Sequence, residues 1–172
     1  MRYFTGELWR NINSDDRTVR EQAREEWKKR GALYSKIYDR EKKLFPEDYI
    51  RIYEKAHGFH DLTIKNINMI MDGWTNRSCV VELSDGKEEY ELVFQGVSSF
   101  AASFPSFPAR KRDELWWGYD EIGHKGKRLS ISVLCAFENE FTINFKTVTV
   151  NTITVQSRDS VGNTRDVFHV PK

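Results

Sequence analysis

The spacing of apolar residues changes once along the chain, near residue 59, and this change constrains the fold more than any other feature. Over residues 15–44, apolar side chains recur mostly at steps of three, four or seven, the period of an amphipathic helix. From Leu62 onward they alternate with polar side chains, the period of a half-buried strand. We therefore predict an α+β fold, in which N-terminal helices are followed by an antiparallel β-sheet meander of about six or more strands.

Three helices are expected within residues 1–58. Thr5 is placed to cap a short first helix, and the segment Asn13–Asp16 to cap a longer second one. Gly31 lies in the middle of this second helix, so the pattern leaves open whether residues 15–44 form one helix or two.

Residues 59–172 are predicted to form the β part, which joins the helical part in one compact unit. A phase slip near Lys65–Asn66 indicates a bulge, and Ser84–Gly86 indicates a hairpin turn. The segment 129–137 is apolar on both faces, which is typical of a central strand.

Composition excludes several classes of protein. Among 172 residues, 27 are basic and 26 acidic, and this balance argues against a nucleic-acid partner or a membrane surface. No run approaches the roughly 20 apolar residues that cross a bilayer, and the N-terminus has no signal-peptide pattern. Cys79 and Cys135 are too few for a disulfide scaffold and too far apart for a zinc pair, so we expect reduced thiols and a cytoplasmic location.

The connection 98–113 combines aromatic and basic residues without an obvious period. Connections of this length tend to be functional or disordered. Its phenylalanines either fold back over the sheet or offer an apolar anchor to a partner. We take Phe100, Phe104, Phe107 and Arg110 as candidate binding residues.

A second candidate is the aromatic and acidic stretch that follows this connection. Its members are Trp116, Trp117, Tyr119, Asp120 and Glu121. On a strand, adjacent residues face opposite ways, so the two carboxylates do not form an acid–base pair. The stretch is either a binding patch or a strand that packs alternate side chains into the core.

A third candidate lies where the helices give way to the strands. His57, His60 and Asp61 are residue types that hold divalent metals. Against a metal site, His60 and Asp61 face opposite ways if a strand begins there. His57 also suits a helix C-terminus, where an imidazolium meets free carbonyls. We expect a structural role for this cluster and predict no cofactor.

Four stretches together resemble a bacterial family known only as a domain of unknown function. They are the opening Met1–Trp9, the junction Gly58–Asp61, the strand end Phe94–Val97 and the run Trp117–Glu121. The His60–Asp61 doublet followed by F-x-G-V is also similar, more loosely, to small immunity proteins of bacterial toxin systems. Neither resemblance implies catalytic residues.

These observations favour a non-enzymatic module that binds a protein partner, and the immunity resemblance implies a toxin as that partner. The alternative is a metal-dependent hydrolase centred on His57, His60 and Asp61. A third reading is a sensor that holds a small molecule or nucleotide between helices and sheet.

Overall fold

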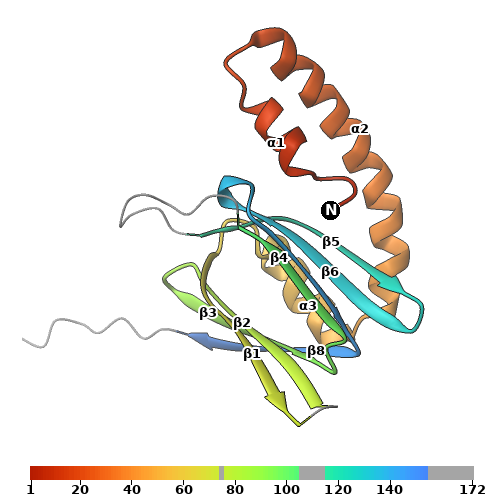
Figure 1. Cartoon of the computed structure of the whole chain (residues 1–172), viewed down its shortest axis with the longest axis vertical. Coiled ribbons are helices and arrows are strands. Elements are labelled where there is room, and N and C mark those ends of the chain that lie inside the picture. The colour runs from red at the N-terminus through yellow and green to blue at the C-terminus, as the bar shows by residue number, and fades with distance from the viewer. Residues whose placement is uncertain (74–75, 105–114, 155–172) are drawn as a thin grey trace, which may run out of the picture.

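The computed structural model describes residues 1–73, 76–104 and 115–154 (Figure 1). The helices are α1 (Gly6–Ile12), α2 (Arg17–Glu41) and α3 (Glu47–Lys55), with short 3-10 turns η1 (Lys42–Leu44), η2 (His57–Phe59) and η3 (Ala136–Glu138). The strands are β1 (Thr63–Asp72), β2 (Asn76–Ser84), β3 (Glu88–Gln95), β4 (Ser99–Ser103), β5 (Trp117–Lys125), β6 (Arg128–Cys135), β7 (Glu140–Phe145) and β8 (Thr147–Thr154). The α-helices precede antiparallel strands, which confirms the predicted α+β class.

The two N-terminal helices begin at the predicted caps. The Thr5 hydroxyl accepts a hydrogen bond from the Leu8 amide at 3.3 Å, and the Asp16 carboxylate accepts one from the Thr18 amide at 2.7 Å. Helix α2 runs without interruption through Gly31, so the open question of one helix or two is decided in favour of one. No helix in the described ranges combines the length and apolar character that crossing a membrane requires.

The strands divide into two four-stranded sheets. One has the order β1-β2-β3-β8 and the other β4-β7-β6-β5, with antiparallel neighbours throughout. The pairs β3–β8 and β4–β7 join strands far apart in sequence, so the meander is interrupted where the chain passes from one sheet to the other. The predicted bulge is present between Ile64 and Asn66, and β6 is a central strand as expected.

The prediction that residues 98–113 lack periodic structure is wrong at their N-terminal end. Residues Ser99–Ser103 form β4, which pairs with β7. Its small side chains, Ala101 and Ala102 among them, hide the alternation that identifies a strand. Pairing with a strand distant in sequence supplies the hydrogen bonds that the local pattern does not predict.

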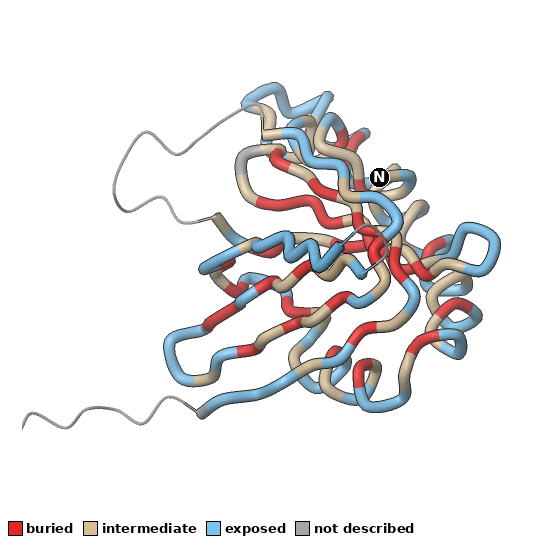
Figure 2. Tube along the Cα trace, turned by 60° about the horizontal axis from the view of Figure 1, so that its bottom comes forward, coloured by how far each residue is buried: buried red, intermediate tan, exposed pale blue. Residues whose placement is uncertain are grey.

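The core lies between the sheets, and α3 packs against it. Buried positions alternate along the strands (Figure 2). Helix α3 contributes Tyr49 to the same core, and Phe59 after it is fully buried. Helix α2 lies beside β5, and the Tyr34 hydroxyl of α2 accepts a hydrogen bond from the Ile122 amide at 2.7 Å (Figure 1). Helix α1 packs against α2 and η3. The β5 edge of the second sheet is therefore covered by α2.

Candidate functional site

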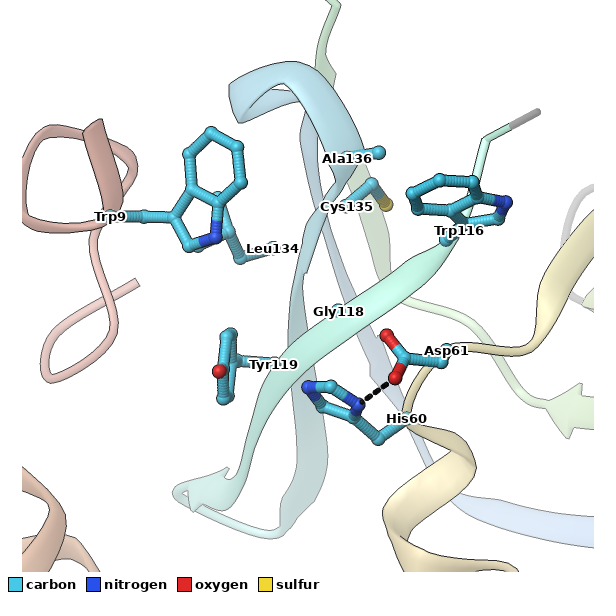
Figure 3. Close-up of a pocket in the computed structure, with 9 residues that line it drawn as sticks. All are labelled: Trp9, His60, Asp61, Trp116, Gly118, Tyr119, Leu134, Cys135 and Ala136. Atoms are coloured by element: carbon cyan, nitrogen blue, oxygen red, sulfur yellow. Dashed lines mark ion pairs between the residues drawn. The ribbon is translucent and has the colours of Figure 1, made fainter. Parts of the chain in front are cut away.

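A pocket of about 280 Å³ opens where α1, the turn after η2 and the first residues of β5 meet. Figure 3 shows Trp9 and Tyr119 on one side, and His60, Asp61 and Trp116 on the other. The lining residues between them are Gly118, Leu134, Cys135 and Ala136. Four residues predicted in two separate clusters, His60, Asp61, Trp116 and Tyr119, thus share one cavity.

The pocket wall that includes His60 and Asp61 is built from unusual backbone. Phe59 and Asp61 both have left-handed φ angles, of 60° and 65°, which cost non-glycine residues roughly 1–2 kcal/mol each. The Asp61 amide donates to the Trp117 carbonyl at 2.8 Å, and burial of Phe59 holds the turn in place. The strained turn therefore fixes the Asp61 backbone against the start of β5.

The polar groups of this wall remain accessible. His60 Nδ1 lies 3.0 Å from Asp61 Oδ2, and the Asp61 side chain is 78% exposed. The His60 ring packs edge-on against Tyr119 with centroids 4.8 Å apart. Burial and the nearby Asp61 carboxylate raise the pKa of Tyr119. The cavity thus presents a negative charge beside aromatic rings.

A bulge in β5 decides which residues of the second cluster reach the pocket. The register slips between Trp117 and Tyr119, so Trp117 and Asp120 both face the core while Tyr119 faces outward. Trp117 is fully buried, and Asp120 accepts a hydrogen bond from the Tyr53 hydroxyl at 2.6 Å. The bulge therefore turns Trp117 and Asp120 inward, as in the alternative of a strand that packs into the core, and a binding role for these two residues stays a prediction.

Glu121, predicted as a binding residue, instead holds the N-terminal segment. Its carboxylate accepts hydrogen bonds from the backbone amides of Arg2, Tyr3 and Phe4 at 2.6–3.1 Å. Its role in the site is to place α1, which begins two residues after Phe4.

Contacts made by residues next to Trp9 in the sequence hold α1, and with it Trp9, at the pocket. Arg10 makes a two-bond ion pair with Glu138 of η3, which lowers the pKa of Glu138. The Phe4 ring packs on Trp27 and Tyr119, with centroids 5.0 and 5.6 Å away. From the sequence, Trp9 is one apolar residue of a short helix, and nothing local indicates that its ring meets a turn near residue 60.

The described part of the phenylalanine connection, residues 98–104, contributes no side chain to the lining of this pocket. Phe100 is in β4, half-buried, and its ring stacks on Phe141 at 6.2 Å, so it folds back onto the sheet. Phe104 is the last residue of the described range 76–104, and it does not line the pocket. Phe107 and Arg110 lie outside the described residues, and their role stays a prediction.

The residues of the metal alternative do not come together as ligands. His57 is exposed and is not part of the pocket lining, although His60 and Asp61 are. Within residues 1–73, 76–104 and 115–154, no three His, Cys, Asp or Glu side chains are grouped so that they could hold a metal ion. His124 pairs instead with Glu41 of α2, at 2.5 Å.

Comparison of the chain with protein-family models, with curated proteins and with solved structures found no match. The two resemblances described from the sequence therefore stay predictions.

Proposed function

We propose that this protein acts by binding a protein partner and that its pocket receives a positively charged side chain of that partner. The observation that carries the proposal is the lining of the cavity. Three aromatic side chains, Trp9, Trp116 and Tyr119, surround it together with the exposed carboxylate of Asp61. Aromatic faces and a carboxylate both attract cations.

The size of the cavity, at the lower end of the range for ligand pockets, is sufficient for one long side chain. Pockets for drug-sized molecules are commonly about 300–1,000 Å³, and this one is about 280 Å³. Trp116 is 45% exposed, so an arginine or lysine entering the pocket would cover apolar surface that now faces solvent. Anchoring of this kind is typical of binding hot spots.

The nucleophile nearest to the pocket does not favour covalent chemistry. Burial, aided by Glu140, raises the pKa of Cys135 to about 12. A thiol with such a pKa is almost entirely protonated at neutral pH, and the thiolate is the reactive form. We therefore assign Cys135 to packing.

We propose a toxin as the partner and the cytoplasm as the compartment, the first from the sequence resemblance and the second from the cysteines. The resemblance to immunity proteins makes a toxin the first partner to test. Cys79 and Cys135 are both buried and unpaired, which fits the reducing cytoplasm where such a partner would have to be neutralised.

A first experiment measures cation binding to the pocket. Nα-acetyl-arginine methylamide is titrated into the labelled protein while the indole N–H resonances of Trp9 and Trp116 are followed by NMR. We expect both resonances to shift with a dissociation constant of about a millimolar, and the citrulline analogue, which has no charge, to bind more weakly.

Variants identify the groups responsible. Asp61→Asn and Trp116→Ala should each weaken arginine binding about threefold, through loss of charge and of a cation–π contact. Asp72→Asn, which removes an exposed aspartate from the end of β1, is the matched control and should change nothing. Equal binding of arginine and citrulline analogues would refute the cationic pocket.

A second experiment tests the protein partner. The genes next to this one are searched for a toxin, and any toxin found is titrated calorimetrically into the wild-type protein and into the Asp61→Asn/Trp116→Ala double variant. We expect the double variant to bind at least about tenfold more weakly. An unchanged affinity would show that a toxin, if bound, uses another surface.

A further inference from the structure

A second pocket adjoins the first and shares part of its wall. It has a volume of about 290 Å³ and lies between α1, the N-terminal half of α2 and β5. Its lining comprises Trp9, Ile12, Asn13, Arg24, Trp27, Lys28 and Tyr119. Trp9 and Tyr119 belong to both linings, so the two cavities are neighbours separated by these two rings.

The two pockets carry opposite charge. The first contains the carboxylate of Asp61, which lies 3.0 Å from His60 Nδ1, and neither lysine nor arginine in its lining. The second contains Arg24 and Lys28, one helical turn apart on α2, and its lining includes no carboxylate. A ligand that crosses from one to the other therefore passes from a cation-binding to an anion-binding surface.

The two cations are available to a ligand. Within the described residues, no hydrogen bond or ion pair engages the Arg24 guanidinium, which is exposed. Lys28 Nζ lies 2.9 Å from Glu25 Oε1, but both side chains are 75% exposed. Exposed ion pairs of this kind contribute little free energy. A carboxylate of a ligand can therefore replace Glu25 as the partner of Lys28 at little cost. Glu26, the next acid on α2, is held by Arg30 at 2.7 Å.

We propose that the partner segment is bipolar: its basic side chain enters the Asp61 pocket, and an acidic side chain close to it in the partner's sequence enters the Arg24–Lys28 pocket. This inference rests on the proposed function, because it assumes that the first pocket holds a cation. It adds to the proposed function that the partner carries an acidic residue near the basic one. The shared rings of Trp9 and Tyr119 lie under the partner backbone between the two side chains.

The test compares peptides that differ by one charge. Acetylated, amidated peptides contain arginine and glutamate separated by zero to three glycines, and each has a twin with glutamine in place of glutamate. Binding is measured by the Trp9 and Trp116 resonances at low salt. At the best spacing we expect the glutamate peptide to bind about three- to fivefold more tightly than its twin, with the advantage shrinking as salt rises.

A double variant assigns this advantage to the second pocket. Arg24→Gln/Lys28→Gln should abolish it and leave binding of the glutamine peptides unchanged. Lys29→Gln/Lys36→Gln removes the same charge from exposed positions of α2 outside the pocket and should preserve the advantage. Circular dichroism of both variants verifies that α2 remains folded.

The outcomes separate this inference from the proposed function. If the arginine peptides bind but glutamate adds nothing at any spacing, the bipolar segment is refuted while the cationic pocket stands. If neither peptide set binds, the proposed function fails first. Free arginine binding as tightly as the best peptide would overturn the assignment to a protein segment, in favour of a free amino acid.

Discussion

Asp120 shows how burial changes the chemistry of one side chain. It lies in the core beside Tyr53, whose hydroxyl donates to it, and Trp117, whose indole N–H lies 3.3 Å away. These bonds favour the ionised carboxylate, but burial favours the neutral acid more strongly. The net effect raises the pKa of Asp120 from 3.8 to about 7.

This pKa predicts how stability depends on pH. Because the folded state holds the proton more tightly than the unfolded state, protonation of Asp120 stabilises the fold below about pH 4, and this contribution is lost as pH rises through about 7. The free energy of unfolding should fall by on the order of 4 kcal/mol across that window. Asp120→Asn should remove this component, as measured by urea denaturation between pH 4 and pH 8.

The comparison needs a control for other acids. Asp72→Asn leaves Asp120 in place and changes an exposed aspartate, so its profile should follow the wild type. Parallel pH profiles for wild type and Asp120→Asn would show that Asp120 titrates normally in the folded protein.

At the scale of elements, α2 and β5 show two different roles for glycine. Gly31 lies within α2, and a Cβ atom there would meet only the Phe4 ring, at 3.9 Å, which is ordinary contact. Gly118 lies at the bulge of β5, and a Cβ atom there would lie 2.6 Å from the Leu134 carbonyl oxygen. The backbone itself is in the way at Gly118, so a flexible side chain cannot relieve the clash.

The two alanine substitutions should therefore have opposite effects. Gly31→Ala should raise the free energy of unfolding by about 0.5–1 kcal/mol, because glycine loses more entropy in a helix. Gly118→Ala should lower it by about 1–3 kcal/mol, because strands β5 and β6 must separate to admit the methyl group. Urea denaturation of both variants tests this, and a neutral Gly118→Ala would show that the bulge can relax.

At the scale of the whole molecule, one edge strand is open and another is covered by a helix. The outer part of β1, around Met69 and Met71, pairs only with β2 in the described part of the chain, and both methionines are exposed. The edge of β5 is covered by α2, where the Ile122 amide donates to the Tyr34 hydroxyl. Covered edges resist pairing with other chains, and open edges invite it.

Hydrogen exchange should distinguish these edges. We expect the Ile122 amide to exchange slowly, like those of the central strands β6 and β7, and the edge-facing amides of β1 near Met71 to exchange fast. Tyr34→Phe removes the acceptor for Ile122 and should speed exchange at that amide while β6 stays protected. Fast exchange of Ile122 in the wild type would contradict the covered edge.

The sequence alone was sufficient for features that depend on neighbours along the chain. The helical period, the caps at Thr5 and Asp16, the bulge near Lys65 and the apolar pattern of β6 each depend on side chains a few residues apart. It was also sufficient to single out Asp61 and Trp116, although in two separate clusters.

Only the tertiary structure decided which distant segments meet. The pairing of β4 with β7, the inward turn of Asp120 and the placement of Trp9 and Asp61 around one pocket depend on packing between residues far apart in sequence. Hydrophobic burial drives such packing but is non-directional, so a periodic pattern shows which face is buried without showing what buries it. The pocket is formed by that packing, which is why its residues were visible in the sequence and their meeting was not.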